Sequence, residues 1–275
     1  MIANARMYSM TPEVGALWRR LLAAVLARAG SAVEIVEHAP PAPIAELWLR
    51  PDKAAVFMCG LPQSLAEPRP ALVAAPVPSP AAYAGRPCYW SELVVRADSG
   101  LATLEQTFGQ RLALTTPESQ SGFAAPLHAL MAHGDVRPIY REVVAPAVTP
   151  MGALQAVIDR RAEVAPIDSY AFALMQRHAP ALAAQVRSVA STEPTAIPAL
   201  VASGAPSPAI VGALLAADGD AATRALMEPL MLKHFVAPDP AGYDALRARF
   251  EAMRAFWRGH PLAATVHPSF ARALR

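Results

Sequence analysis

Strand-like and helix-like segments alternate along almost the whole chain, with prolines between them. The 28 prolines fall mostly between apolar runs rather than inside them, so they mark loops and not a polyproline tract. Regular alternation of this kind favours parallel βαβ units over a sandwich or a helical bundle. We therefore expect an α/β fold in which each sheet is mostly parallel and is flanked by helices.

The clearest single element is a helix near the N-terminus. Thr11 is a capping residue, Pro12 suits the first helical position, and Glu13 lies near the positive end of the helix dipole. Gly30 is a typical residue just past a helix end. Between them apolar residues recur with the helical period of 3.6: Val14, Leu17, Trp18, Leu21, Leu22, Val25 and Leu26.

The remaining segments form two series, which indicates two lobes. Residues 1–93 are expected to form lobe 1 and residues 94–197 lobe 2. The further expectation that residues 198–275 return to lobe 1 rests on the family resemblance described below. In the first series we expect strands at 2–8, 33–37, 54–59 and 72–76. In the second we expect strands at 110–115, 141–145, 164–168 and 186–192, with helices at 122–133, 151–161 and 170–178. The C-terminal part is expected to be helical at 208–217, 220–235 and 243–257.

Composition excludes several classes of protein. Apolar residues make up 54% of the chain and charged residues 17%, so disorder is excluded. The 24 basic and 22 acidic residues are spread thinly, with no basic run, and we expect no nucleic-acid partner. The longest apolar stretch, Val14 to Ala29, is interrupted by Arg19, Arg20 and Arg28, so we expect no stable membrane insertion.

Cellular location and redox state stay open from the sequence. The first ten residues lack the basic segment and apolar segment of an export signal. The protein is therefore either cytoplasmic, or periplasmic after removal of a signal. Cys59 and Cys88 could form one disulfide, but two buried thiols are favoured. His128 and His133 are five residues apart on a helix and do not share a face, so no metal and no cofactor is expected.

The stretch from Leu112 to Phe123 is the most informative for function. An apolar strand leads into the turn Thr115-Thr116-Pro117-Glu118-Ser119-Gln120-Ser121-Gly122, which opens a helix. Free backbone N–H groups, the positive end of the dipole and two serine hydroxyls suit an anion. The alternative is that Ser119 or Ser121 only caps the helix. Lysine is absent, so this is not a nucleotide P-loop.

Several segments resemble the phosphate, phosphite and phosphonate-binding proteins of ABC transporters, which have the type II periplasmic-binding-protein fold. The resemblance spans roughly residues 5 to 200. The matching segments are Met7-Tyr8-Ser9-Met10-Thr11-Pro12-Glu13, Met58-Cys59-Gly60-Leu61-Pro62, Tyr89-Trp90-Ser91-Glu92-Leu93-Val94-Val95-Arg96, Pro117-Glu118-Ser119-Gln120-Ser121-Gly122, Ala156-Val157, and Ala162-Glu163-Val164-Ala165-Pro166-Ile167-Asp168-Ser169.

The resemblance implies a solute-binding protein that closes on a small anion in a cleft between two lobes and serves an ABC permease. The crossings between lobes would fall near Val94–Ala97 and Thr192–Ile197. The implied ligand-binding residues are Tyr8, Tyr89, Ser119, Gln120, Ser121 and Asp168. Further cleft residues would be Cys59, Gly60, Ser91, Thr149 and Thr192.

Two departures from the family pattern widen the range of ligands. Gln120 stands in the middle of a turn that commonly reads Ser-Thr-Ser-Gly, and Thr149-Pro150 replaces a frequent Ser-His pair. Histidine can pair with a phosphonate oxygen, whereas proline cannot. The predicted site also contains no obvious Arg or Lys. A carboxylate, a sulfur oxyanion or a neutral polar ligand therefore stays open beside phosphonate.

A binder is favoured over a catalyst, with one alternative. No common catalytic or nucleotide-binding motif occurs, and no catalytic residue is predicted. Cys59, followed by Gly60 at a strand end, is the one candidate nucleophile, because loops after strands face the crevice in such sheets. The alternative is thus a cytoplasmic enzyme of the same fold acting on a small cofactor-pathway intermediate.

Overall fold

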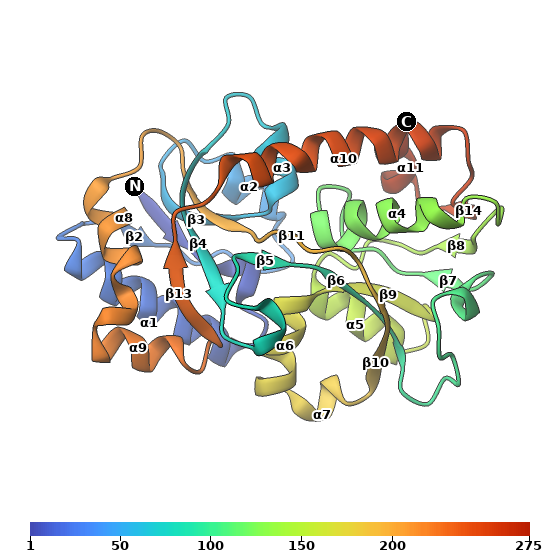
Figure 1. Cartoon of the computed structure of the whole chain (residues 1–275), viewed down its shortest axis with the longest axis horizontal. Coiled ribbons are helices and arrows are strands. Elements are labelled where there is room, and N and C mark those ends of the chain that lie inside the picture. The colour runs from blue at the N-terminus through green and yellow to red at the C-terminus, as the bar shows by residue number, and fades with distance from the viewer. The chain divides into compact units, whose positions relative to one another are not determined.

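A computed structural model describes residues 1–275, and the chain divides into two compact units. The first unit contains Met1–Cys88 and Ala196–Tyr243, and the second contains Tyr89–Thr195 and Asp244–Arg275. Each unit has its own six-stranded sheet with helices packed around it (Figure 1).

The division differs from the expected lobes at the C-terminus. Residues 198–275 were all expected in lobe 1, whereas Asp244–Arg275 belongs to the second unit. Two interactions explain this placement. Strand β14 (Ala263–Val266) pairs in parallel with β8 (Tyr140–Val143), and the indole N–H of Trp257 donates to the carbonyl of Leu127 at 2.9 Å. The first expected crossing, Val94–Ala97, lies within the second unit, and the chain instead passes between units at Cys88 and Tyr89.

The sheet of the first unit has the order β13-β4-β12-β3-β1-β2. Its strands are β1 (Ile2–Asn4), β2 (Glu34–Ile35), β3 (Lys53–Met58), β4 (Ala71–Pro78), β12 (Ala199–Ala202) and β13 (Leu232–Val236). Its helices are α1 (Pro12–Arg28), α2 (Ile44–Trp48), α3 (Gly60–Leu65), α8 (Pro208–Leu215) and α9 (Ala221–Met227).

Helix α1 follows its sequence signals closely. The Thr11 hydroxyl accepts a hydrogen bond from the Val14 N–H at 3.2 Å, and Gly30 has a positive φ of 59° just beyond the helix end. The buried face consists of Val14, Trp18, Leu21, Leu22, Val25 and Leu26. Trp18 has no solvent exposure, and its ring meets the ring of Phe57 from β3 edge-on at 5.1 Å. Helix and sheet thus share one apolar core in this unit.

The sheet of the second unit has the order β10-β6-β9-β7-β8-β14. Its remaining strands are β6 (Ser91–Arg96), β7 (Arg111–Leu112), β9 (Val164–Asp168) and β10 (Val186–Ser191). Its helices are α4 (Ala125–Leu130), α5 (Pro150–Ile158), α6 (Ser169–His178), α7 (Pro180–Ala183) and α11 (Pro268–Leu274). Helix α10 (Pro240–Arg258) contains the last boundary between the units. Strands β5 (Cys88–Tyr89) and β11 (Thr195–Ala196) form a separate two-stranded sheet.

Both large sheets are mixed, although mostly parallel sheets were expected. In the first unit β1 is parallel to β2 and β3, but β12 runs antiparallel to β3 and β4. In the second unit β7 is parallel to β8 and β9, but β6 runs antiparallel to β9 and β10. Strands β6 and β12 each follow a passage from one unit to the other, so no crossover helix fixes their direction.

One expected helix is wrong in its second half. The segment 220–235 was expected to be helical throughout, but α9 ends at Met227 and Leu232–Val236 is strand β13. This strand pairs antiparallel with β4, where Phe235 lies opposite Pro76. Pro229 lies between the two elements. Pairing with a distant strand therefore overrides the local helical pattern.

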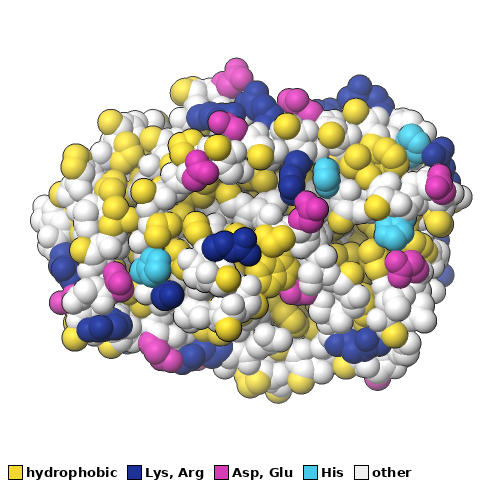
Figure 2. Space-filling model, viewed as in Figure 1, with side chains coloured by type: hydrophobic (Ala, Val, Ile, Leu, Met, Phe, Trp, Pro, Cys, Tyr) yellow, Lys and Arg dark blue, Asp and Glu magenta, His cyan; other side chains and the backbone are white.

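None of the helices combines the length and the apolar character that a membrane span requires. On the face in Figure 2, positive and negative side chains are interspersed, without a basic stripe. Cys59 is buried and Cys88 half-buried, and neither forms a disulfide.

Candidate functional site

Three helix starts lie along one edge of the second unit's sheet. Parallel strands β7, β8 and β9 each end in a loop that leads into a helical segment. The capping residues of these segments are Ser119, Thr149 and Asp168. Ligands of α/β proteins bind at the carboxyl edge of parallel strands, because the loops there carry free polar groups. Sequence-predicted residues from three separate segments thus meet at one edge.

The segment after β7 is a wide helical turn, Gln120–Ala124, that continues into α4. The Ser119 hydroxyl accepts a hydrogen bond from the Gly122 N–H at 2.8 Å and so caps the turn. Ser121 is 8% exposed, and its hydroxyl makes no hydrogen bond within the protein. The two serines therefore differ in role. The Ser119 hydroxyl caps the turn, whereas the Ser121 hydroxyl is available to bind a ligand.

Gly122 permits the close approach of this turn to the end of β7. A Cβ atom at residue 122 would lie 1.8 Å from Thr115 Oγ1, well inside van der Waals contact. The Thr115 N–H donates to the Gly122 carbonyl at 3.2 Å. Only glycine therefore fits here without displacing Thr115.

The loop after β8 carries Thr149, and its geometry explains the Thr149-Pro150 pair. The Thr149 hydroxyl accepts from the Gly152 N–H at 3.0 Å, and Pro150 takes the first position of α5. The neighbouring Val148 N–H donates to the Thr115 carbonyl at 3.2 Å, which ties this loop to the one after β7. Thr149 thus acts as a helix cap beside the serine-containing turn.

Asp168 ends β9 and caps α6. Its Oδ1 accepts hydrogen bonds from the Tyr170 and Ala171 N–H groups, both at 2.9 Å. These bonds favour the carboxylate, but burial disfavours the charge more strongly and raises the pKa of Asp168 to about 7. Near neutral pH the carboxyl group is therefore present in both protonation states, and its protonated form can donate a hydrogen bond.

Ser91 links the predicted residues of this unit. It has no solvent exposure, and its hydroxyl donates to the Ser121 carbonyl at 2.7 Å. Its N–H donates to Thr192 Oγ1 at 3.0 Å, and it lies opposite Asp168 in the pairing of β6 with β9. Ser91, Ser121, Asp168 and Thr192 are therefore brought together. Tyr89, two residues before Ser91, is 1% exposed.

Three predicted residues belong to the first unit. Tyr8 is 1% exposed, and its ring packs edge-on against Phe57 with 5.3 Å between centroids. Cys59 and Gly60 are buried where β3 ends and α3 begins. Their participation in a shared ligand site with the second unit stays a prediction.

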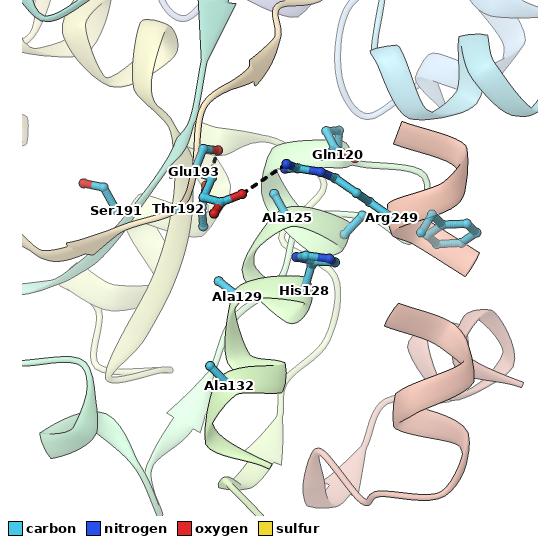
Figure 3. A pocket seen from close by; sticks show the side chains of 11 residues that line it. Gln120, Ala125, His128, Ala129, Ala132, Ser191, Thr192, Glu193 and Arg249 are labelled. Atoms are coloured by element: carbon cyan, nitrogen blue, oxygen red, sulfur yellow. Dashed lines mark hydrogen bonds and ion pairs between the residues drawn. The ribbon is translucent and has the colours of Figure 1, made fainter. Parts of the chain in front are cut away.

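The second unit also contains a pocket of about 340 Å³, which involves residues that sequence reasoning did not single out for a site. Gln120 and Thr192, both predicted site residues, line it, together with His128, Glu193 and Arg249 (Figure 3). Arg249 comes from α10, and no local signal links it to a turn some 130 residues earlier. A usable signal was the helical spacing of the small residues Ala124, Ala125, Ala129 and Ala132, which marks a close approach of another segment.

The ends of β7, β8 and β9 carry no basic side chain in segments 112–123, 144–150 and 168–169. Backbone N–H groups, hydroxyls and helix dipoles therefore supply the polar environment at this edge. No group of three or more His, Cys, Asp or Glu side chains is placed to hold a metal ion.

Solved structures of other proteins share this architecture. A binding protein component of an ABC phosphonate transporter from Pseudomonas aeruginosa matches with a TM-score of 0.77 and 17% identity, covering 99% of this chain and 93% of that one. PhnD1 from Prochlorococcus marinus, solved with methylphosphonate, matches with a TM-score of 0.73 and 12% identity, covering 92% and 98%. A Xanthomonas citri protein solved with ATP matches with a TM-score of 0.59 and 18% identity, covering 94% and 98%. The fold is that of the type II periplasmic binding proteins.

The sequence itself identifies the family. Residues 16–243 match the ABC transporter phosphonate periplasmic substrate-binding protein family, and the chain belongs to it. Members are ligand-binding components of uptake systems and not enzymes, which confirms the prediction of a binder over a catalyst. A search of curated proteins finds no match to this sequence.

Proposed function

We propose that the chain binds a small oxyanion at the carboxyl edge of β7, β8 and β9, and delivers it to an ABC permease. The observation that carries this proposal is the helix start at Ser119–Gly122, where the Ser121 hydroxyl is not used by the protein. Backbone N–H groups at a helix start, with the dipole behind them, stabilise negative charge.

The chemistry of the edge favours an anion of low charge. Asp168 is buried beside the helix start, and segments 112–123, 144–150 and 168–169 contain no arginine or lysine. A dianion would meet the Asp168 carboxylate without a compensating cation from these segments. A monoanion, or an anion whose binding favours the protonated form of Asp168, fits better. A phosphonate monoanion and a sulfonate both satisfy this condition.

We also propose that the ligand is held in a cleft between the two units, with Tyr8, Tyr89, Gln120, Cys59, Gly60 and Thr149 near it. This assignment follows from the family resemblance. The Tyr8→Phe variant tests it, because loss of a hydroxyl that contacts the ligand would weaken binding, whereas a purely packed ring would leave affinity unchanged.

The experiment is a thermal-shift series with methylphosphonate, phosphite, phosphate, methanesulfonate and acetate, followed by calorimetry on any stabilising compound. A ligand at 100 times its Kd stabilises the folded state by about 2.7 kcal/mol, which is readily measured. Stabilisation by a phosphonate or sulfonate is expected. If none of the anions stabilises the protein at millimolar concentration, the proposed oxyanion site does not exist.

A further inference from the structure

The pocket of the second unit lies beside the helical segment that runs from Gln120 to His133. One face of this segment lines the pocket, and its residues there recur at helical spacing: Gln120, Ala124, Ala125, His128, Ala129 and Ala132. The alanine methyl groups leave space where larger residues would fill the gap between helices. The Ser119 and Ser121 side chains do not line this pocket, so it is separate from the serine hydroxyls at the helix start.

The other walls come from two segments that are distant in sequence. Arg249 and Phe250 of α10 face the helix on one side, and Ser191, Thr192 and Glu193 at the end of β10 on the other. In Figure 3, Ala125, Ala129 and Ala132 project from the side of the helix nearer Thr192 and Glu193, while His128 lies nearer α10. The pocket therefore combines an apolar wall with a polar rim.

One ion pair lies at the polar rim. Arg249 Nη2 is 3.1 Å from Glu193 Oε2, and the Glu193 side chain is 76% exposed. An exposed carboxylate is only weakly held by a surface arginine, because water competes for both groups. Glu193 can turn into solvent at little cost, and Arg249 can then donate two parallel hydrogen bonds to another carboxylate.

The remaining groups set the charge that an occupant should carry. The pKa of His128 is lowered by burial and by the nearby Arg249, against a smaller opposite effect of Glu193, so the imidazole is neutral at neutral pH. Arg249 is then the one cation on the pocket wall, with Glu193 as the one anion. A dianion would be repelled by Glu193 without a second cation to balance it.

We propose that this pocket is a second ligand site, which takes a small monocarboxylate with an apolar body. The ligand carboxylate replaces Glu193 on Arg249, and its hydrocarbon part lies against the alanine methyls and the Phe250 ring. A pocket of about 340 Å³ that combines an apolar wall with a polar rim has the size of a small-molecule site. The proposal does not depend on oxyanion binding at the helix start.

Benzoate is the probe, and calorimetry or two-dimensional NMR on the full chain is the measurement. Saturable binding of benzoate is expected. Benzyl alcohol, which lacks the charge, should bind much more weakly. Methylphosphonate, which lacks the apolar body, should also bind this pocket much more weakly. Arg249→Gln should weaken benzoate binding at least about tenfold, or 1.4 kcal/mol. Glu193→Gln should strengthen it several-fold, because the competing carboxylate is gone.

A packing variant and control variants distinguish loss of this site from a general change in the stability of the protein. Ala129→Leu should fill the pocket and abolish benzoate binding while the protein stays folded. Arg258→Gln and Ala252→Leu change exposed residues of α10 and should leave the affinity unchanged. Ser121→Ala, directed at the helix start, should also leave benzoate binding unchanged.

Three results would overturn the proposal: no saturable benzoate binding, equal affinity in the Arg249→Gln and Glu193→Gln variants, or loss of binding in Ser121→Ala. If Arg249→Gln does not fold, the opposite effects expected for Glu193→Gln and Ala129→Leu still decide the outcome. Failure of the anion series with methylphosphonate would refute the first site alone.

Discussion

The Ser119 hydroxyl accepts the Gly122 N–H at 2.8 Å, which commits one of the two serines of the turn to holding the helix start. Ser119→Ala should therefore lower the free energy of unfolding by about 1 kcal/mol, the usual value of such a cap. For a chain of this size the melting temperature should fall by about 2–4 °C. Ser119→Thr, which keeps the acceptor oxygen, is the control, and an unchanged melting temperature in Ser119→Ala would contradict the capping role.

Ser121 should behave in the opposite way. Its hydroxyl makes no hydrogen bond within the protein, so Ser121→Ala should leave the free energy of unfolding nearly unchanged. Binding of the best oxyanion should weaken by about 1–3 kcal/mol, because a buried ligand oxygen loses its partner. Calorimetry measures the affinity, and the exposed Ser79→Ala is the matched control. Wild-type affinity in Ser121→Ala would remove this residue from the site.

Gly122 should be intolerant of even one added methyl group. A Cβ there would lie 1.8 Å from Thr115 Oγ1, so Gly122→Ala should destabilise the fold by about 1–3 kcal/mol. The double variant Gly122→Ala/Thr115→Ala should recover part of this loss, which urea unfolding would reveal as non-additivity.

Gly212 provides a control of opposite sign. It lies within α8 with nothing within 4 Å of an added Cβ, so Gly212→Ala should stabilise by about 0.5–1 kcal/mol. For the double variant Gly122→Ala/Thr115→Ala, a loss of stability equal to the sum of the two single losses would show that the two residues are not in contact.

Asp168 should make stability depend on pH. Burial raises the pKa of its carboxyl group in the folded protein to about 7, against 3.8 in the unfolded chain. Between about pH 4 and 7 the folded state therefore binds more protons than the unfolded state. The stability that this extra proton provides is fully present below about pH 4 and is lost as pH rises toward 7. Asp168→Asn keeps a capping oxygen but does not titrate, so its unfolding free energy should vary less between about pH 4.5 and 7.5.

Asp220 is the matched control for this titration. It caps α9 by accepting from the Thr223 N–H at 2.9 Å, and that hydrogen bond holds the pKa of the exposed carboxyl group below its usual value. The contribution of the ionised Asp220 carboxylate to stability is present above its unfolded pKa and is lost as pH falls. This pH dependence is opposite to that expected for Asp168. Parallel pH profiles for wild type and Asp168→Asn would contradict the buried titration.

Local signals were sufficient for elements whose ends carry their own polar groups. Thr11 and Pro12 predicted the start of α1, and strand β9 has the predicted bounds, Val164–Asp168. In both cases the determining hydrogen bonds lie within three residues of the signal. The serine-containing turn was found for the same reason, because its cap joins Ser119 to Gly122.

Long-range pairing could not be predicted in this way. Strand β13 was taken for helix because nothing within 228–236 reveals its partner, β4. Arg249 was missed for the same reason, since its ion pair with Glu193 joins residues 56 positions apart. The mixed character of the sheets likewise depends on where the chain enters each unit.

The pairing of β14 with β8 has a consequence for the order in which the protein folds during synthesis. All strands of the first unit's sheet have been made once Val236 is translated, although that unit's chain is interrupted by the second. The second unit's sheet must wait for Ala263–Val266, and until then the edge of β8 is open to other strands. On the ribosome the unit that begins first should therefore also be finished first, and the unit inserted within it last.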